Sequence, residues 1–277
     1  MAITETKTNE TYVLGSSEQE HERLIRQAGI FSTITERLFQ DAGVASGHRV
    51  LDLGSGLGDV AMLACRLVGP SGTVLGVDND ARSLAKAKTR VAEAGLRNVT
   101  FVESDLTSME NVEPFDAIVG RFILEFLPSP GVVVSSICEK LKPGGVVAIQ
   151  DACWGPFLQL CSHLPLRSKC ADLIYQSFQR SGANMDMELV LYRIFQEAGL
   201  APPRMRVEIP IGDEPDIRNY VCDLFYSLYP RLQQQNISTE GVGNIATLRE
   251  RLEAERTVSK SFGACQALVG AWSRKRA

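Results

Sequence analysis

Three glycines at alternate positions, Gly54, Gly56 and Gly58, follow a short apolar run and precede a segment with helical periodicity. Because glycine has no Cβ, the main chain there can approach a ligand closely where a buried strand passes into a helix. A dinucleotide-binding loop has the spacing GxGxxG and holds a diphosphate at the helix N-terminus. The position of its third glycine is Asp59 in this chain, and a carboxylate there repels a diphosphate. The loop therefore favours a cationic ligand without phosphates.

Acidic residues also end the next two apolar runs. Asp78 ends "VLGVD", and Asp105 follows "TFVES". At the carboxyl edge of a parallel sheet, Asp78 is placed to accept hydrogen bonds from ribose hydroxyls, and Asp105 to accept one from an exocyclic adenine amine. A surface turn or a helix cap would explain any one acid alone. Acids at three successive strand ends, with Asp59 as the first, favour a nucleoside site.

Alternating strands and helices must position these residues. Apolar runs predict strands over 49–54, 73–79, 99–105, 115–122 and 146–152, with helices between them. This alternation implies right-handed crossovers and a doubly wound α/β fold with a parallel sheet. One or two amphipathic helices precede it, with an interruption near Gly29, and the helix that follows the fourth strand should end at the Pro-Gly-Gly of 143–145.

We expect a single domain over residues 1–277. Its parts would be an N-terminal helical cap (1–45), a cofactor-binding core (46–152), two helical lid segments (153–203 and 213–258) and a last strand (264–273). The segment "RMRVEIPI", 204–211, is predicted as a strand between the two lid segments.

The motifs "VLDLGSGLGD", "GVDND", "ESDL", "FDAIVGRFILEFLP" and "LKPGG" occur in the order typical of one enzyme family. Over residues 48–152 the chain resembles class I S-adenosylmethionine-dependent methyltransferases. The resemblance implies a seven-stranded, mostly parallel Rossmann-like sheet with an antiparallel last strand, and S-adenosylmethionine as cofactor. The cofactor-binding residues that it implies are Asp52, Gly54, Ser55, Gly56, Gly58, Asp78, Asn79, Ser104, Asp105, Leu106, Arg121 and Phe122.

The same resemblance implies a role for several of these residues. The three glycines would line the methionine moiety, Asp78 would hold the ribose, and Asp105 would meet the adenine. Leu106 would cover the adenine face, and the backbone carbonyl of Arg121 would lie against the methionine end.

The opening stretch "YVLGSSEQEHERLIRQ" resembles a subgroup that acts on small molecules, including natural products and quinone-type acceptors, and so suggests secondary metabolism. N-terminal helices close over the cofactor in that subgroup. We therefore expect Tyr12 to face the acceptor and Arg23 or Gln27 to reach the methionine carboxylate. A solvated helix face is the alternative for Arg23 and Gln27. An exposed N-terminal helix would also allow a homodimer.

A sulfonium carries an activated methyl group and leaves as a neutral thioether, so no universal catalytic residue is expected. Glu125 is a candidate base for the acceptor, with an ordinary helix or loop carboxylate as the alternative. Asp151 and Trp154 follow the fifth predicted strand and should border the acceptor pocket, although Trp154 suits a core position as well. Asp151 and Tyr12 are, with Glu125, the candidate catalytic residues. His163 is expected to be a partly exposed helical histidine rather than a catalytic base.

Aromatic residues of the lid segments suggest an apolar acceptor pocket. We assign Tyr175 and Tyr226 to it, and expect two or three members of the whole group to touch the substrate. The group is Tyr175, Phe178, Tyr220, Phe225, Tyr226 and Tyr229.

Several classes of protein are disfavoured. Asp151 is followed by Ala152 rather than asparagine, unlike metal-dependent catechol-type methyltransferases, so no metal is expected. A net charge of −4 and "GRFI" in place of an (N/D)PP(Y/F) motif argue against a nucleic-acid substrate. No stretch approaches the roughly 20 apolar residues of a membrane span, and the N-terminus lacks an apolar signal core. We expect a cytoplasmic protein whose seven cysteines are reduced and mostly buried.

The predicted function is S-adenosylmethionine-dependent methyl transfer, by in-line displacement, to a small and partly apolar acceptor. The methylated atom, oxygen, nitrogen or carbon, stays open. The alternatives are a non-catalytic module that binds S-adenosylmethionine, a cyclase that depends on the same cofactor and, less favoured, an NAD-dependent oxidoreductase, which Asp59 argues against.

Overall fold

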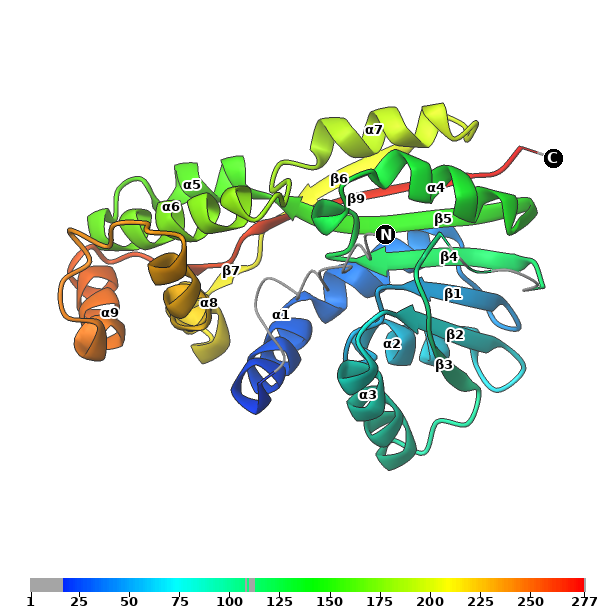
Figure 1. Ribbon diagram of the computed structural model, residues 1–277, viewed down its shortest axis with the longest axis horizontal. Coiled ribbons are helices and arrows are strands. Elements are labelled where there is room, and N and C mark those ends of the chain that lie inside the picture. Colours follow the sequence, from blue (N-terminus) through cyan, green and yellow to red (C-terminus); the bar gives the residue numbers. More distant parts are fainter. Residues whose placement is uncertain (1–16, 108, 110–112, 277) are drawn as a thin grey trace, which may run out of the picture.

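A seven-stranded sheet forms the centre of the protein in a computed structural model that describes residues 17–107, 109 and 113–276 (Figure 1). The strand order is β3-β2-β1-β4-β5-β9-β6, and β9 runs antiparallel to both of its neighbours. The strands are β1 (Arg49–Leu53), β2 (Thr73–Asp78), β3 (Val99–Glu103), β4 (Phe115–Arg121), β5 (Leu141–Cys153), β6 (Arg204–Glu208) and β9 (Ala267–Arg274). The predicted fold class and the antiparallel last strand are confirmed. The order reverses between β1 and β4, and such a switch point opens a crevice at the carboxyl ends of the strands.

Helices cover both faces of the sheet because its strands are apolar on both sides. Val50 and Leu51 are consecutive in β1 and belong to hydrophobic cores on opposite faces. The core around Val50 packs against α1 (Glu18–Ala42), α2 (Asp59–Val68) and α3 (Ala81–Glu93). The core around Leu51 packs against α4 (Pro130–Glu139) and α7 (Glu188–Glu197).

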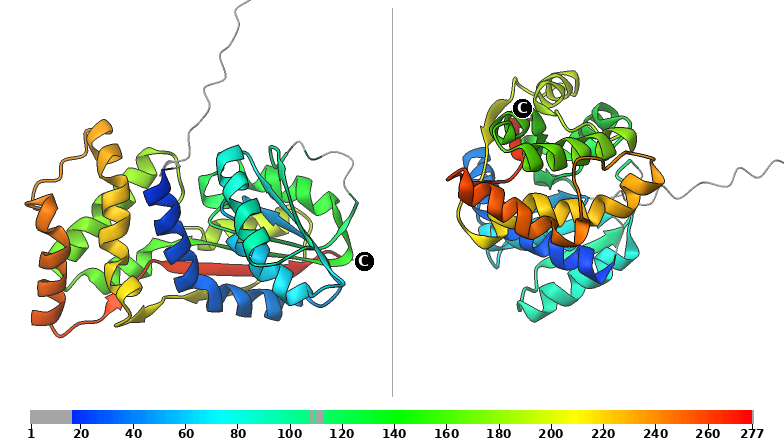
Figure 2. Two further views of the ribbon diagram at one scale, coloured as in Figure 1. Left: turned by 90° about the horizontal axis from the view of Figure 1, so that it is seen from below. Right: turned by 90° about the vertical axis from the view of Figure 1, so that its left-hand side faces the viewer.

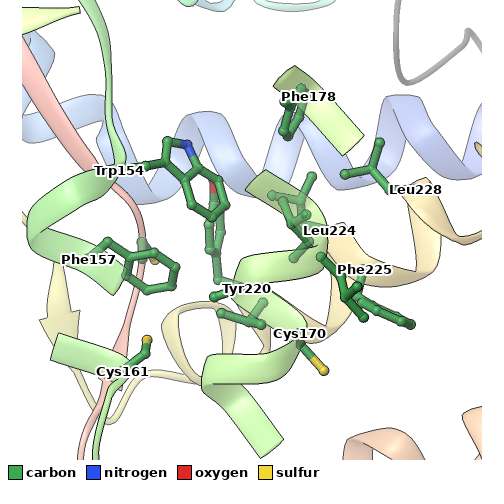
Figure 3. Close-up of a cluster of buried hydrophobic side chains, with 14 of the residues drawn as sticks. Trp154, Phe157, Cys161, Cys170, Phe178, Tyr220, Leu224, Phe225 and Leu228 are labelled. Atoms are coloured by element: carbon green, nitrogen blue, oxygen red, sulfur yellow. The ribbon is translucent and has the colours of Figure 1, made fainter. Parts of the chain in front are cut away.

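A group of helices lies beyond the carboxyl ends of the parallel strands, on the left of Figure 1 and of the left-hand view in Figure 2. We call this group the cap; it is distinct from the predicted N-terminal helical segment 1–45. The cap consists of α5 (Trp154–Cys161), α6 (Pro165–Arg180), α8 (Pro215–Gln234) and α9 (Leu248–Val258). The short helices η1 (Leu124–Phe126) and η2 (Ile245–Thr247) and a two-stranded sheet of β7 (Ile211–Gly212) and β8 (Gly263–Ala264) complete the described elements. The cap has its own hydrophobic core, drawn in Figure 3, to which Phe31 of α1 also belongs.

The N-terminal helix differs from its prediction. The helix is capped by Ser17, whose side chain accepts a hydrogen bond from the Glu20 amide at 3.1 Å. No break occurs at Gly29, and α1 runs for 25 residues. A helical glycine costs only about 1 kcal/mol. Burial of Phe31, Leu38 and neighbouring residues along the whole helix outweighs that cost.

Three predicted strands also have different boundaries in the structure. Helix α4 ends at Glu139, and the Pro-Gly-Gly segment belongs to β5 because Leu141 already pairs with Phe115. The segment 204–211 divides, since β6 ends at Glu208 and Ile211 pairs with Ala264 in the small sheet. The predicted last strand is divided between β8 and β9 for the same reason. Pairing partners distant in sequence decide these boundaries.

All seven cysteine side chains are buried, and none of them forms a disulfide bond. Among the residues that the structure describes, no helix combines the length and the apolar character that a bilayer span requires.

Candidate functional site

A cleft of about 220 Å³ opens at the carboxyl ends of β1 to β4. Six of the residues predicted from the motifs line it: Gly54, Asp78, Asn79, Ser104, Asp105 and Leu106. The prediction missed seven further lining residues: Thr107, Ile123, Leu127, Pro128, Ser129, Val132 and Val133. Most of these follow β4, where η1 leads into α4, and the apolar motif "ILEFLP" is the signal that marks them. The cleft thus has a polar wall from β2 and β3 and an apolar wall from η1 and α4.

Each position of the loop is glycine for a different physical reason. Gly54 has φ +62°, and a Cβ there would lie 2.5 Å from Ile123 Cδ1. Gly58 begins α2 with φ +82°, and its Cβ would lie 3.1 Å from Ala87 and Phe101. A Cβ at Gly56 (φ +48°) would meet no atom within 4 Å. Gly54 and Gly58 therefore allow close internal packing, and the expected contact of Gly58 with the ligand stays a prediction. Gly56 borders open space.

Asp78 holds the glycine loop in place at the end of β2. Its Oδ2 accepts a hydrogen bond from the Gly56 amide at 2.8 Å, and its Oδ1 accepts one from the Asp80 amide at 2.9 Å. Burial raises the pKa of this carboxyl. Each carboxylate oxygen can accept a second hydrogen bond, so Asp78 can bind donors in the cleft while it orients the loop.

The end of β3 supplies a second carboxylate. Asp105 is exposed, and its Oδ1 accepts hydrogen bonds from the Thr107 amide at 2.7 Å and from Thr107 Oγ1 at 2.5 Å. The Ser104 hydroxyl donates to the Asp105 carbonyl at 3.0 Å. Leu106 next to it is 8% exposed and belongs to the core. Thr107 thus orients an acceptor at one end of the cleft.

A buried carboxyl lies beneath the loop. Asp52 is 1% exposed, and neither of its carboxylate oxygens has a hydrogen-bond partner among the described residues. Burial raises the pKa of Asp52 to about 8, against the influence of nearby Arg121. An uncompensated buried carboxylate is unfavourable. A cation bound at the loop would relieve that cost. Ser55 is buried next to it, and its amide donates to the Val77 carbonyl at 3.0 Å.

Because the pKa of Asp52 is raised, we predict that the free energy of unfolding depends on pH through this residue. A carboxyl whose folded pKa lies above its unfolded value of 3.8 stabilises the fold fully below that value, and the contribution is lost as pH rises to about 8. In Asp52→Asn the amide stands in for the neutral acid at every pH. Urea unfolding at several pH values should show the variant gaining on the wild type between pH 4 and 8, by on the order of 6 kcal/mol. Parallel curves for the two proteins would contradict the raised pKa.

The side chain of Arg121 points toward α1. Its Nη1 donates to Thr35 Oγ1 at 3.0 Å, and that hydroxyl lies 2.6 Å from Gln150 Oε1. Phe122 follows with φ +56°, and its ring meets Phe31 edge to face with the centroids 5.4 Å apart. Both residues connect the end of β4 to α1. The predicted contacts of Arg121 and Phe122 with the cofactor stay a prediction.

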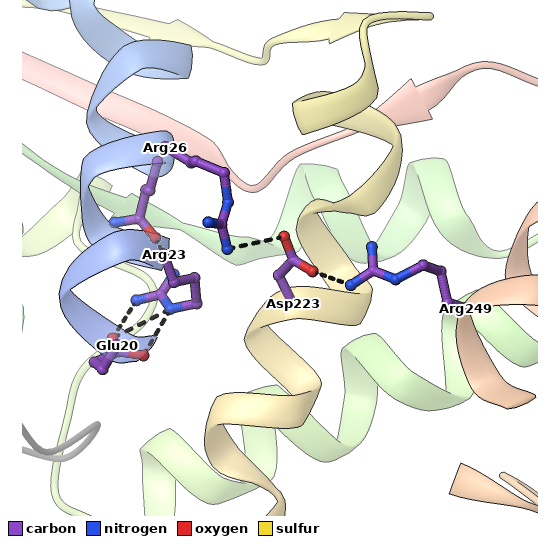
Figure 4. Close-up of polar contacts among 6 residues, drawn as sticks. Glu20, Arg23, Arg26, Asp223 and Arg249 are labelled. Atoms are coloured by element: carbon purple, nitrogen blue, oxygen red, sulfur yellow. Dashed lines mark hydrogen bonds and ion pairs between the residues drawn. The ribbon is translucent and has the colours of Figure 1, made fainter. Parts of the chain in front are cut away.

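Arg23 and Gln27 require a correction. Arg23 is buried, donates to the Glu20 carboxylate through Nε and Nη2, and donates to Gln27 Oε1 through Nη1 at 2.7 Å (Figure 4). Both residues line a small cavity against α8, where Arg26 pairs with Asp223 at 3.7 Å. They do not line the cleft at the strand ends, and the alternative of a solvated face is wrong for Arg23. Tyr12 lies outside the described residues.

The acid at the start of α2 also has a role that the spacing did not indicate. Asp59 forms an ion pair with Arg90 of α3 at 2.7 Å, and Arg90 also donates to the Leu57 carbonyl. It is not among the residues that line the cleft. Arg90 offsets its charge, so the repulsion expected toward a diphosphate is weaker than the sequence indicated.

Each of the two candidate bases is buried and accepts a hydrogen bond from a main-chain amide. Glu125 is 2% exposed, and its Oε2 accepts a hydrogen bond from the Ala152 amide at 2.6 Å. Asp151 is completely buried, and its Oδ1 accepts one from the Ile123 amide at 2.8 Å. Burial raises the pKa of both, that of Asp151 to about 7. A base must reach an acceptor proton. The expected catalytic role is therefore corrected, because neither side chain lines the cleft.

The aromatic residues of the cap are mostly core. Trp154 is completely buried and meets Phe157 edge to face at 5.3 Å (Figure 3). Tyr175 is half-buried and donates to Asp186 Oδ2 at 2.5 Å, which raises its pKa to about 12. Tyr226 donates to the Ile245 carbonyl at 3.0 Å, in the contact of α8 with η2. The pocket assignment of Trp154 is therefore corrected, because its side chain is completely buried in the core. The assignment of Tyr226, which is partly buried, stays a prediction.

The remaining expectations concern residues of the cap and its edges. Phe178, Tyr220 and Phe225 are buried in the cap core, and Tyr229 packs against it. His163 is exposed, as expected, but it lies in the turn between α5 and α6 rather than in a helix, and its Nε2 lies 3.1 Å from Ser261 Oγ. Within residues 17–107, 109 and 113–276, no three His, Cys, Asp or Glu side chains are grouped so that they could hold a metal ion.

Sequence comparison identifies two named relatives over part of the chain. It is 35% identical over 111 residues to an arsenite methyltransferase of Halobacterium salinarum, a match that covers 40% of this chain and 28% of that protein. It is 36% identical over 112 residues to the ubiquinone/menaquinone biosynthesis C-methyltransferase UbiE of Pseudomonas paraeruginosa, covering 40% of this chain and 44% of the relative. The chain thus spans less than half the length of these curated relatives.

Comparison of structures and of family models covers more of the chain. A SAM-dependent methyltransferase from Aquifex aeolicus has the same fold, with a TM-score of 0.53 and 14% identity over 94% of this chain and 99% of that one. The family model described as "Methyltransferase domain" matches residues 45–199, more than half of the chain and the whole of the glycine loop and its neighbouring strands. The chain belongs to this family of methyltransferase domains.

Proposed function

We propose that the protein is an S-adenosylmethionine-dependent methyltransferase that acts on a small, partly apolar molecule. One observation carries the proposal: open space at Gly56 adjoins the Asp78 carboxylate, and β1, which leads into this loop, carries the buried and unpartnered Asp52. A loop without side chains fits the close approach of a ligand. The Asp78 carboxylate, together with the buried Asp52 that a bound cation would help to ionise, fits a cationic nucleoside better than a phosphorylated one. Membership of the methyltransferase domain family supports the same reaction.

The lining of the cleft suggests how this chain would hold the cofactor. Asp78 would accept hydrogen bonds from the ribose hydroxyls, and Asp105 would accept one from the adenine amine. Leu106 and Val133 belong to the core and offer apolar contact for the adenine ring. Asp52 would face the positive end of the ligand from beneath the glycine loop.

The bound cofactor would supply a methyl group already activated as a sulfonium. This chain would then orient an acceptor in line with the methyl group and exclude water. Because Glu125 and Asp151 are engaged with main-chain amides, we propose that catalysis here depends on alignment rather than on either carboxyl as a base.

The half-buried aromatic side chains suggest where the acceptor binds. Phe122, Phe126 and Tyr175 pack against the cap core and are only partly buried. Phe126 also meets Phe178 with the ring centroids 6.0 Å apart. We propose that Phe122, Phe126 and Tyr175 form the apolar part of the acceptor site. Secondary metabolism, a cytoplasmic location and a homodimer stay predictions from the sequence.

Calorimetric titration of the full chain with S-adenosylmethionine and with NAD tests the proposal. Binding of S-adenosylmethionine alone is expected, and binding of NAD alone would overturn it. Turnover is then measured on an acceptor panel that begins with arsenite and a quinone precursor, because two relatives are named for such substrates. A product heavier by one methyl group identifies a transferase, a rearranged product of unchanged mass identifies a cyclase, and binding without any product identifies a non-catalytic module.

A further inference from the structure

Two buried carboxyls connect η1 and β5 reciprocally. Glu125 of η1 accepts a hydrogen bond from the amide of Ala152 in β5, at 2.6 Å. Asp151 of β5 accepts one from the amide of Ile123, just before η1, at 2.8 Å. Each element thus binds a main-chain amide of the other through its own acid. The Glu125 carbonyl also accepts a hydrogen bond from the Asn184 amide at 2.8 Å, which ties the turn to the chain entering α7.

The two carboxyls are not both stable as anions at this place. Glu125 is 2% exposed and Asp151 is 0% exposed, so water screens neither of them. Asp151 Oδ2 is buried and accepts no hydrogen bond within the part of the chain that the structure describes. Burial raises the pKa of Glu125, and the charge of nearby Asp151 raises it further. Two buried carboxylates that repel each other favour a proton on one of the pair. That proton belongs to the pair rather than to either residue.

We propose that Glu125 and Asp151 share a single proton and act together as positioning residues for the cofactor cleft. The hydrogen lies between the two carboxyls and satisfies the otherwise unpartnered Oδ2. The remaining oxygens keep their main-chain partners. The pair thereby fixes η1 onto the end of β5 without placing a net charge of −2 in the interior.

This arrangement affects the cleft because residues on either side of η1 line it. Ile123 lies against Gly54, where a Cβ would come within 2.5 Å of it, and Ile123 and Leu127 line the apolar wall. Loosening η1 would therefore move that wall away from the glycine loop. This part of the inference rests on the proposed function, because the cleft must hold the cofactor for the wall to affect its binding.

A double-mutant cycle in the full chain tests the shared proton. In Glu125→Gln or in Asp151→Asn, the amide oxygen keeps the main-chain bond and the amide NH2 supplies the hydrogen between the two side chains. In the double variant two NH2 groups face each other without an acceptor. Each single variant should keep the dissociation constant for S-adenosylmethionine within about threefold, and the double variant should weaken it at least tenfold, or about 1.4 kcal/mol. Its Tm should fall by at least about 4 °C more than the sum of the two single shifts.

A matched pair provides the control. Asp80 follows β2 and accepts a hydrogen bond from the Arg82 amide at 3.1 Å. Asp116 lies at the start of β4 and accepts one from the Arg49 amide at 2.8 Å. The two acids therefore lie at opposite ends of the sheet. The shifts in Tm of Asp80→Asn and Asp116→Asn should simply add. Additive shifts in the Glu125/Asp151 cycle would overturn the shared proton. Non-additive Tm values with unchanged cofactor affinity would overturn the positioning role. Failure of the wild type to bind S-adenosylmethionine would instead count against the proposed function.

Infrared spectroscopy covers the case in which the double variant does not fold. The spectra are recorded in an Asp52→Asn background, because that buried acid is also protonated near neutral pH. At pH 7 the background protein should show a protonated carboxyl band that either single amide variant removes. Persistence of the band in both single variants would overturn the shared proton.

Discussion

Replacement of Asp78 by alanine should weaken S-adenosylmethionine binding about 100-fold. The substitution would remove two hydrogen bonds between the carboxylate and the ribose. Hydrogen bonds to charged groups contribute about 1.5 kcal/mol or more each. The substitution would also release the Gly56 amide that Asp78 Oδ2 holds at 2.8 Å, so the glycine loop would be less ordered. Since 1.4 kcal/mol corresponds to a factor of ten, these losses give the expected factor. Isothermal titration calorimetry measures the change directly.

Asp116→Ala is the matched control for this variant. Asp116 also accepts a hydrogen bond from a main-chain amide, that of Arg49, at 2.8 Å, and it forms an ion pair with Lys142 at 2.8 Å. It lies at the start of β4, opposite the carboxyl ends that form the cleft. The two variants should lose similar stability, and only Asp78→Ala should lose cofactor affinity. Equal affinities for both variants would contradict the assignment of Asp78 to the ribose.

Replacement of Gly56 by leucine should reduce cofactor affinity at least about 100-fold while the protein stays folded. The backbone at Gly56 has φ +48°, which costs an L-residue about 1–2 kcal/mol. No atom lies within 4 Å of the position of its Cβ, so the leucine side chain would enter open space rather than the core. If that space is the place of the cofactor, the side chain blocks it. Titration calorimetry and urea unfolding separate the loss of binding from the strain.

Gly95→Leu provides the same strain away from the cleft. Gly95 follows α3 with φ +67°, and its Cβ would likewise meet no atom within 4 Å. Its unfolding free energy should fall by about the same 1–2 kcal/mol, and its cofactor affinity should match the wild type. Normal binding by Gly56→Leu would show that the bare main chain at this loop faces no ligand.

The buried pair of Glu125 and Asp151 changes how the end of β4 is interpreted. In the sequence each acid resembles a candidate base, because both follow predicted strands that lead into the cleft. In the structure each one accepts a hydrogen bond from the amide of a residue 27 or 28 positions away. The motif "ILEFLP" therefore serves the cleft through the wall that η1 forms, with the acid as an internal connection.

The sequence by itself determined the doubly wound class of fold and the polar wall of the cleft. Strand and helix periods are local properties, and the residues at the carboxyl ends of β1, β2 and β3 follow directly from them. Gly54, Asp78 and Asp105 were therefore found without any knowledge of tertiary contacts.

Only the tertiary structure decided what the remaining candidates do. The Arg121 side chain meets Thr35, 86 residues earlier, and Tyr226 meets Ile245 in a different element of the cap. Arg23 was predicted at the cofactor, but the position of α1 against α8 buries it beside Glu20. A side chain's chemical type fixes which partners suit it, whereas the packing of distant segments selects one of them. Local periodicity carries no information about that selection. The roles of these residues therefore follow from the packing and not from the periodicity.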